Sequence, residues 1–176
     1  MSDELLQIVD RDGNPAGTAP RSECHGNPGL IQAVVHLHLF DRTGRLYLQK
    51  RAADKDRYPG RWDTSVGGHV SPGESPEQAI RREAREELAI DLDGPAKADG
   101  LPHLERLEPY IYRDEIETEY VVPYRLAYSG ALRPNPEEVE EGAFFDMNEI
   151  RRRLREEPQR FTPHFRLAFV TLLVAG

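Results

Sequence analysis

The spacing of apolar residues along the chain predicts several β-strands. Runs of residues that alternate between apolar and polar, or that are apolar throughout, are typical of strands. Such runs lie at residues 4–9, 31–40, 46–50, 107–112 and 120–128, with an edge strand expected at 143–145. A turn sequence at 41–44 makes 31–40 and 46–50 a hairpin, and residues 18–29 are expected to form a loop.

A helix is predicted directly after residue 75. Ser75 is a good N-cap, Pro76 suits the first helical position, and Gln78 completes a capping box at the third. The helix then carries an apolar stripe suited to packing against a sheet, formed by Ile80, Ala84 and Leu88.

Two more helices are expected near the end of the chain. Asp146 caps the first of them, and Thr162-Pro163 opens the second. Four apolar residues of the second helix are available for burial, namely Phe165, Phe169, Leu172 and Leu173. Strands, a helix, more strands and two helices predict an α/β fold, an α/β/α sandwich in which helices cover both faces of a mixed β-sheet.

Length and composition indicate one globular domain. The chain has 176 residues, of which 38% are hydrophobic and 31% charged. We expect an N-terminal strand and loop extension at 1–29, a core at 30–148 and C-terminal helices at 149–176. The net charge of −8 argues against nucleic acid and anionic membranes as partners. Cys24 is the single cysteine, and no signal pattern or membrane-length apolar run is present, so a cytoplasmic location is expected.

Three carboxylates are crowded on the predicted helix that follows Ser75. Glu83 precedes Glu86 and Glu87 by three and four residues, so all three lie on neighbouring parts of one helical face. Their mutual repulsion is unfavourable, and Mg²⁺ or Mn²⁺ would reverse it because these ions prefer carboxylate oxygens. Arg82 could hold Glu86 or Glu74 in place. The alternative is a solvated acidic helix with Arg–Glu pairs, and the glycine turn leading to Glu74 argues against it.

Positive charge is concentrated just before this helix, at Lys50, Arg51, Lys55, Arg57 and Arg61. In an acidic protein this is the natural place to receive phosphate groups, although a solvated loop is the alternative. The nearby Trp62 is expected to be a core anchor.

Other polar residues leave more than one interpretation open. His36 and His38 point to the same face of a strand, where they could bind a metal or be ordinary sheet residues. The Cys24-His25 pair is most simply incidental. The acidic segment 113–119 is expected to be mostly a solvated hairpin loop, from which Glu119 or Glu117 could reach the site as a general base.

Residues 68–90 resemble the signature of the Nudix hydrolases. In that signature a glycine and a glutamate precede an Arg-Glu pair, which is followed by a Glu-Glu pair, a glycine and an apolar residue. Its fixed positions are filled by Gly68, Glu74, Arg82, Glu83, Glu86 and Glu87, and its apolar positions by Ala84 and Ile90. Ala89 stands where the family has glycine, which puts the end of the helix in doubt more than the metal site.

From about residue 4 to residue 168 the chain is similar to the Nudix branch related to isopentenyl diphosphate isomerase. In that enzyme residues at the positions of Arg51 and Lys55 bind the substrate diphosphate, and the positions of His25 and His69 are metal ligands. Two positions depart: Gly67 stands where the isomerase has its catalytic cysteine, and Gln32 where it has another histidine ligand. Without a side chain at position 67, proton transfer at an allylic carbon lacks an essential partner.

The resemblance implies a Mg²⁺-dependent hydrolase, with Mn²⁺ as the other candidate ion. Water activated by the metal would attack a diphosphate linkage in a nucleoside di- or triphosphate or a nucleoside diphosphate derivative. The expected metal ligands are Glu83, Glu86, Glu87 and the Gly68 carbonyl; Arg82 and Glu74 would orient them, and the base would be Glu86 or a residue of 113–119 such as Glu119. An isomerase and a catalytically silent nucleotide-binding module are the alternatives. Nudix proteins are often dimers, so a homodimer is an open expectation.

Overall fold

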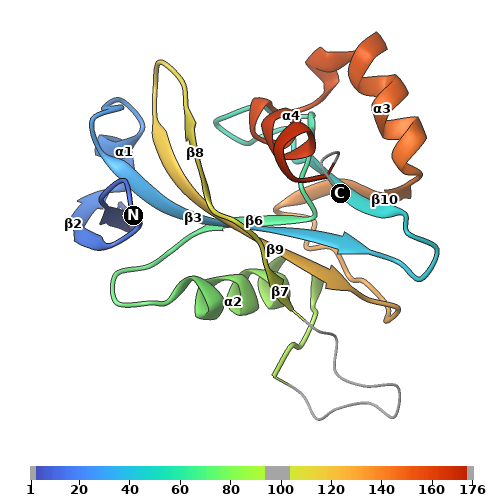
Figure 1. The fold of residues 1–176 in the computed structure, drawn as a ribbon, viewed down its shortest axis with the longest axis horizontal. Coiled ribbons are helices and arrows are strands. Elements are labelled where there is room, and N and C mark those ends of the chain that lie inside the picture. The colour runs from blue at the N-terminus through green and yellow to red at the C-terminus, as the bar shows by residue number, and fades with distance from the viewer. Residues whose placement is uncertain (1–2, 94–103, 174–176) are drawn as a thin grey trace.

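The computed structural model describes residues 3–93 and 104–173, which form one β-sheet with helices on both faces (Figure 1). The strands are β1 Leu5–Val9, β2 Pro15–Pro20, β3 Ile31–Phe40, β4 Leu46–Arg51, β5 Trp62–Asp63, β6 Val66–His69, β7 Glu105–Arg106, β8 Tyr110–Arg113, β9 Thr118–Ala127 and β10 Val139–Phe145. The helices are α1 Arg21–Cys24, α2 Pro76–Leu88, α3 Met147–Glu156 and α4 Pro163–Ala168, with short helical turns η1 Pro158–Arg160 and η2 Phe169–Leu173. No helix in these two described ranges is long and apolar enough to cross a bilayer.

The central strand of the sheet is β3. It runs parallel to β9 along its whole length, from Ile31 opposite Thr118 to Phe40 opposite Ala127, and antiparallel to β6. The sheet is therefore mixed, as the order of elements predicted. The expected hairpin of β3 and β4 is confirmed only next to its turn, where Phe40 pairs with Leu46, because β4 pairs mainly with β10.

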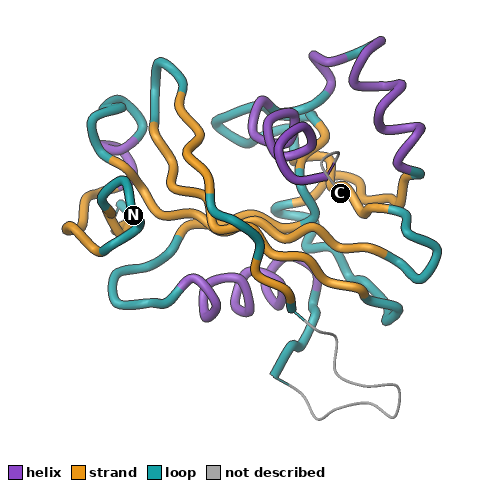
Figure 2. The backbone as a smooth tube through the Cα atoms, in the orientation of Figure 1, coloured by secondary structure: helices purple, strands orange, loops and turns teal. Residues whose placement is uncertain are grey.

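Helices lie on both faces of the sheet (Figure 2), and each face has its own apolar core. On one face, the stripe predicted on α2 is fully buried against β3 residues such as Val35 and Leu37. On the other face, Trp62 and β4 pack against the C-terminal helices, to which Ile150 and Phe165 belong. The predicted α/β/α sandwich is confirmed, and burial of these large apolar side chains fixes both layers to the sheet.

The predicted N-cap of α2 is confirmed, and the C-cap that follows its last residue, Leu88, has an unusual conformation. Ser75 and Gln78 form the capping box in both directions. Ala89 adopts the left-handed conformation with φ of 55°, and the Ile90 N–H donates to the Ala84 carbonyl oxygen at 3.1 Å. The chain therefore makes the turn that normally uses glycine, with a side chain that disfavours it.

Some expectations for the connecting segments are wrong. Residues 18–29 are not all loop, because β2 continues to Pro20 by pairing with β1, and α1 follows directly. The acidic segment 113–119 is not mostly solvated, since Glu117, Thr118 and Glu119 are buried. The turn-rich connection expected at 91–100 lies largely outside the described residues.

Candidate active site

A cavity of about 480 Å³ brings together residues that are far apart in the chain. Its walls come from β3, β6, α2, β9, α4 and the loop between β4 and β5. All three predicted metal carboxylates, Glu83, Glu86 and Glu87, line it. The apolar stripe on α2 explains this placement: burial of the stripe against the sheet holds the neighbouring helical face at the cavity.

The three helix carboxylates differ in their surroundings. Glu87 is only 6% exposed and accepts a hydrogen bond from Gln49 Nε2 at 2.9 Å. Glu83 is also largely buried, whereas the side chain of Glu86 is 56% exposed. Burial raises the pKa of Glu83 to about 7 and that of Glu87 well above its ordinary value, and the charges of Glu86 and Glu83, respectively, add to this. Both groups are therefore harder to ionise than an ordinary glutamate, even though Arg82 acts in the opposite direction on Glu83.

Arg82 ties the glycine turn to the carboxylate helix. Its Nε and Nη2 atoms donate to the two carboxylate oxygens of Glu74, each at 3.0 Å, and Nη2 also donates to the His69 carbonyl oxygen at 3.0 Å. Its Nη1 atom donates to Glu83 Oε1 at 2.6 Å and to Glu86 Oε2 at 3.3 Å. The two partners that the sequence offered for Arg82, Glu74 and Glu86, are thus both used, and Glu83 is a third.

The two glycines of β6 shape the wall of the cavity next to the helix. A Cβ atom on Gly68 would lie 2.1 Å from Cδ of Glu83, so only glycine lets this carboxylate rest against the strand. A Cβ atom on Gly67 would lie 3.3 Å from Cδ2 of His36, a tight contact but not a prohibitive one. A small side chain at position 67 would therefore contact His36 and Thr64 in the cavity wall.

The basic segment divides into residues that line the cavity and residues that do not. Arg51, Lys55 and Arg57 line it. Arg51 is 3.4 Å from Asp63 through Nη1, and Lys55 forms an ion pair with Glu138. By contrast, Lys50 pairs with Glu140 at 2.7 Å, outside the group of lining residues.

A second cluster of metal-binding side chains lies at the start of β9 and was not recognised as a unit from the sequence. Glu117, Glu119 and His164 each offer one ligand atom, and these three atoms lie within 4.8 Å of one another. Among the residues that the structure describes, no other three His, Cys, Asp or Glu side chains bring their ligand atoms this close together. Glu83, Glu86 and Glu87 share the cavity but are more widely spread. The N-cap Thr162 places His164 in the first turn of α4, but no sequence signal indicates which way it points.

Four other histidines surround this region or lie near it. His25 Nε2 is 3.2 Å from Glu117 Oε2, and the rings of His25 and His69 are 6.1 Å apart. His36 lines the cavity, while His38 is fully buried with Nδ1 3.3 Å from Thr64 Oγ1. Burial lowers the pKa of His25 and His36, and that of His69 to about 4, so all three are neutral imidazoles near pH 7.

The donor set of the cavity fits a divalent cation. It supplies several carboxylates, of which Glu83 and Glu87 are destabilised as anions by burial, and Glu119 Oε2 is buried without a hydrogen-bond partner. Carboxylate oxygens are the ligands that Mg²⁺ and Mn²⁺ prefer in proteins, and imidazole suits transition-metal ions.

Curated relatives match nearly the whole chain. The isopentenyl-diphosphate Delta-isomerase of Leifsonia xyli is 33% identical over 173 residues, which are 98% of this chain and 93% of that protein. The enzyme of the same name from Streptomyces griseus is 34% identical over 172 residues, or 98% of this chain and 83% of that protein. In both comparisons the similarity extends well beyond the carboxylate helix.

Solved structures share the fold. A crystal structure of a Deinococcus radiodurans protein aligns with a TM-score of 0.72 at 24% identity, covering 88% of this chain and 90% of that one. A MutT NUDIX hydrolase from Burkholderia pseudomallei aligns with a TM-score of 0.61 at 25% identity, covering 80% and 96%. The model of the NUDIX domain matches residues 29–165, which include most of the residues that line the cavity, the carboxylate helix and the first half of α4. On this evidence the chain belongs to the NUDIX family.

Proposed function

We propose that this protein hydrolyses a diphosphate linkage in a nucleoside di- or triphosphate, or in a nucleoside diphosphate derivative, with Mg²⁺ as the expected ion and Mn²⁺ as the second candidate. The observation that carries the proposal is the meeting of two sets of side chains in one cavity. Glu83, Glu86 and Glu87 line it together with Arg51 and Lys55. Diphosphate hydrolysis needs carboxylates that bind a cation beside positively charged side chains that bind phosphate.

The charge balance of the cavity supports a metal requirement. Carboxylates outnumber the Arg and Lys side chains among its lining residues. A diphosphate would therefore be repelled unless cations compensate the excess negative charge. A bound divalent cation would supply that compensation and would lower the pKa of a water molecule to make it a nucleophile.

The residues of the chain would then have separate roles. Arg51 and Lys55 would hold the phosphate oxygens, Arg as a fork and Lys as a point charge. Arg82 would keep Glu83 and Glu86 in place through the contacts that it makes to both and to Glu74.

Of the two candidate bases, Glu86 is favoured over Glu119. Burial acts against ionisation of Glu119, but attraction to His164 and a hydrogen bond with it outweigh burial and lower the pKa of Glu119. A carboxylate whose pKa is held low is a weak proton acceptor. Glu86, by contrast, is open to a cavity that water can enter.

The alternative that the protein is an isomerase is supported by the names of its curated relatives. Two features of the cavity argue against it. Gly67 offers no side chain for proton transfer at a carbon atom. The lining residues are mainly charged or polar, with Val34 and Tyr58 among the few others, so there is little apolar surface for a prenyl chain.

A phosphate-release screen would test the proposal. Purified protein is incubated with nucleotides, nucleotide sugars, dinucleoside polyphosphates and prenyl diphosphates, each with Mg²⁺ and with EDTA. We expect Mg²⁺-dependent cleavage of a nucleotide substrate. Conversion of isopentenyl diphosphate to its dimethylallyl isomer without cleavage would overturn the proposal in favour of an isomerase. Melting shifts with ligands but no cleavage of any substrate would indicate a binding module.

A further inference from the structure

We infer that Arg57 is a positioning residue: it fastens the β4–β5 loop, residues 52–61, to the hairpin of β8 and β9 and thereby sets the direction in which Arg51 enters the cavity. Arg51 is the last residue of β4, and Arg57 follows six residues later in the loop. The inference rests on the proposed function only where it takes phosphate as the ligand of Arg51. The fastening of the loop can be measured without any substrate.

The Arg57 side chain crosses from the loop to the turn of the hairpin. Its Nη2 atom donates to Asp114 Oδ2 at 2.7 Å, and its Nη1 atom forms an ion pair with Glu117. The side chain of Arg57 is only 16% exposed, so solvent and salt screen these contacts less than they would at the surface. The contact with Asp114 thus joins two connecting segments that lie 57 residues apart in the sequence.

Asp114 is arranged to receive this side chain. Its Oδ1 atom accepts hydrogen bonds from the backbone N–H groups of Ile116 at 2.8 Å and Glu117 at 2.9 Å, which closes the turn of the hairpin. Its Oδ2 atom accepts from Arg57 and from the Tyr112 hydroxyl, the latter at 3.0 Å. The two oxygens therefore have separate tasks: one holds the turn, and the other receives the loop.

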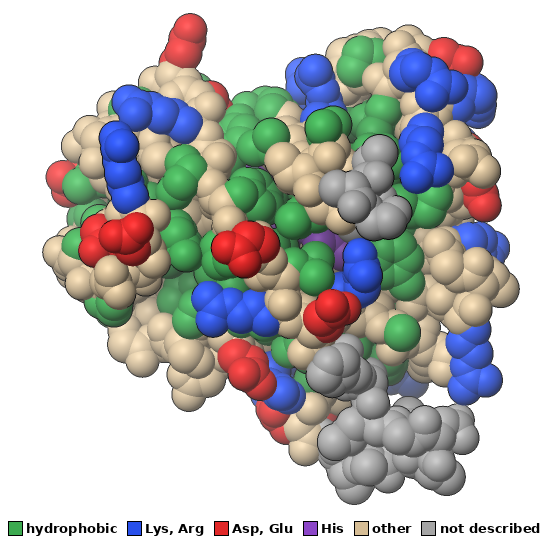
Figure 3. Space-filling view, in the orientation of Figure 1, with side chains coloured by type: hydrophobic (Ala, Val, Ile, Leu, Met, Phe, Trp, Pro, Cys, Tyr) green, Lys and Arg blue, Asp and Glu red, His purple; other side chains and the backbone are tan. Residues whose placement is uncertain are grey.

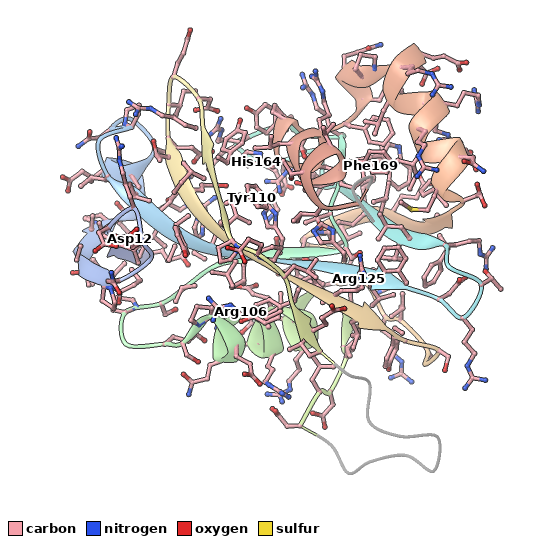
Figure 4. The ribbon with its side chains drawn as sticks, in the orientation of Figure 1. Asp12, Arg106, Tyr110, Arg125, His164 and Phe169 are labelled. Carbon is pink, nitrogen blue, oxygen red and sulfur yellow. The ribbon has the colours of Figure 1, made fainter. Side chains whose placement is uncertain are left out.

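The conformation of the loop depends on contacts of this kind. Tyr58 adopts the left-handed conformation with φ of 51°, which residues with side chains disfavour. Arg57 Nη2 donates to the Tyr58 hydroxyl at 2.9 Å, and its guanidinium carbon lies 5.0 Å from the centre of the Tyr58 ring. On its other side the loop meets His164, whose ring is 5.7 Å from that of Tyr58 and which Figure 4 shows between α4 and the hairpin. These contacts hold the loop in a conformation that Tyr58 alone would not favour.

Arg51 is held by the backbone of the residue that the hairpin fastens. Its Nε atom donates to the Arg57 carbonyl oxygen at 3.0 Å, and its Nη1 atom lies 3.4 Å from Asp63 Oδ2. These two contacts use two of the five N–H donors of the guanidinium and leave others for phosphate oxygens. If the side chain of Arg57 were released from the hairpin, its carbonyl oxygen would be free to move, and Arg51 would lose one of the two contacts that fix its direction.

The first test observes Arg51 itself, in full-length Arg57→Met and Asp114→Asn. Asparagine at position 114 would still accept the hydrogen bonds of the turn through its oxygen, but its amide N–H groups would face those of Arg57, so this variant breaks the loop contact selectively. The readout is the ¹⁵N NMR signal of the Arg51 Nε–H group, assigned by its absence in Arg51→Lys. We expect this signal to shift or to be lost in both variants, because Arg51 loses its carbonyl acceptor.

The second test measures binding of inorganic diphosphate in Mg²⁺ by calorimetry. A guanidinium that is already oriented loses less freedom on binding, so we expect Arg57→Met and Asp114→Asn each to weaken binding about tenfold. The double variant should bind no more weakly than the weaker single variant, because both changes break one contact. Asp114→Asn is decisive: removal of a negative charge by itself would tighten the binding of an anion, whereas loss of the position of Arg51 weakens it.

Asp41→Asn is the matched control. Asp41 likewise closes a hairpin turn and accepts from an arginine, Arg45 Nε, at 2.7 Å, but it lies outside the residues that line the cavity. This variant should leave both readouts as in wild type. An unchanged Arg51 signal in Asp114→Asn, or diphosphate binding as tight as in wild type or tighter, overturns the inference. If Arg57→Met fails to fold, Asp114→Asn decides alone. If wild type binds no diphosphate, the proposed function is contradicted, and the Arg51 signal still decides whether Arg57 positions that side chain.

Discussion

The raised pKa of Glu83 leads to a measurable dependence of stability on pH. In the folded, metal-free protein burial holds this pKa at about 7, against 4.5 for an ordinary glutamate. Between these values the folded protein keeps the proton while the unfolded chain has released it. The stabilising contribution is therefore fully present below pH 4.5 and is lost as the pH rises through 7.

The magnitude follows from the change in pKa. At about 1.36 kcal/mol per pH unit, the difference corresponds to roughly 3 kcal/mol in the free energy of unfolding. Glu83→Gln keeps the size of the side chain and removes its titration. We therefore expect the variant to lack roughly 3 kcal/mol of the decline that wild type shows between pH 4.5 and 7. Glu87, whose pKa is raised in the same direction, remains in both proteins; the variant lacks the Glu83 charge that helps to raise it, so the decline should be reduced by at least this amount.

Urea unfolding in EDTA, at intervals from pH 4.5 to 8, measures this difference. The single tryptophan, Trp62, is buried and reports unfolding by its fluorescence. Glu77→Gln is the matched control, because Glu77 is an exposed carboxylate on the same helix. Saturating Mg²⁺ should reduce the decline in wild type, since the ion binds the deprotonated carboxylates. Equal pH dependence in wild type and Glu83→Gln would refute the reasoning.

Three further predictions concern the ends and walls of the site. Ala89→Gly should stabilise the protein by about 1 kcal/mol and raise Tm by roughly 2–4 °C, because glycine adopts the left-handed conformation found there without strain; an unchanged Tm in calorimetry would contradict this. Gly68→Ala should destabilise by about 1–3 kcal/mol and weaken Mg²⁺ binding, since its Cβ would displace Glu83; wild-type Mg²⁺ affinity in calorimetry would contradict it. Lys55→Met should raise KM roughly tenfold with little change in kcat, as expected for a phosphate contact that is equal in ground and transition states; an unchanged KM would show that Lys55 serves only its ion pair with Glu138.

Local signals in the sequence were sufficient for much of the fold and for one half of the site. The capping box at Ser75 and the apolar stripe of α2 fixed both the start of the helix and the face that it buries. Since Glu83, Glu86 and Glu87 lie on the neighbouring face, their common placement at a cavity followed from helical spacing alone.

The other half of the site depends on contacts between distant parts of the chain. Glu119 and His164 come together because β9 pairs with β3 and α4 packs against the sheet near the start of β9. No local pattern in the sequence indicates either of these long-range contacts. The acidic composition of 113–119 suggested solvent, yet buried partners such as Gln32 and Arg57 compensate Glu117. In β2, pairing with β1 overrides the low strand propensity of a segment with two prolines and a glycine.

The surface outside the site carries mixed charges. Lys, Arg, Asp and Glu side chains are interspersed over the face in Figure 3, without a continuous basic area on that face. The cavity also holds Arg and Lys side chains, such as Arg51 and Lys55, but its carboxylates outnumber them. With cations bound to those carboxylates, this arrangement would favour a small anionic substrate over a large polyanion.

The most direct test of the account is the effect of Glu86→Gln on Mg²⁺-dependent turnover of the substrate found in the screen. Removal of a metal carboxylate from a diphosphate hydrolase should lower kcat by at least about 100-fold, with the fold intact by circular dichroism. Glu77→Gln should retain wild-type turnover. If Glu86→Gln also hydrolyses the substrate at near wild-type rate in Mg²⁺, the carboxylate helix is not the metal-binding element and the proposed mechanism is wrong.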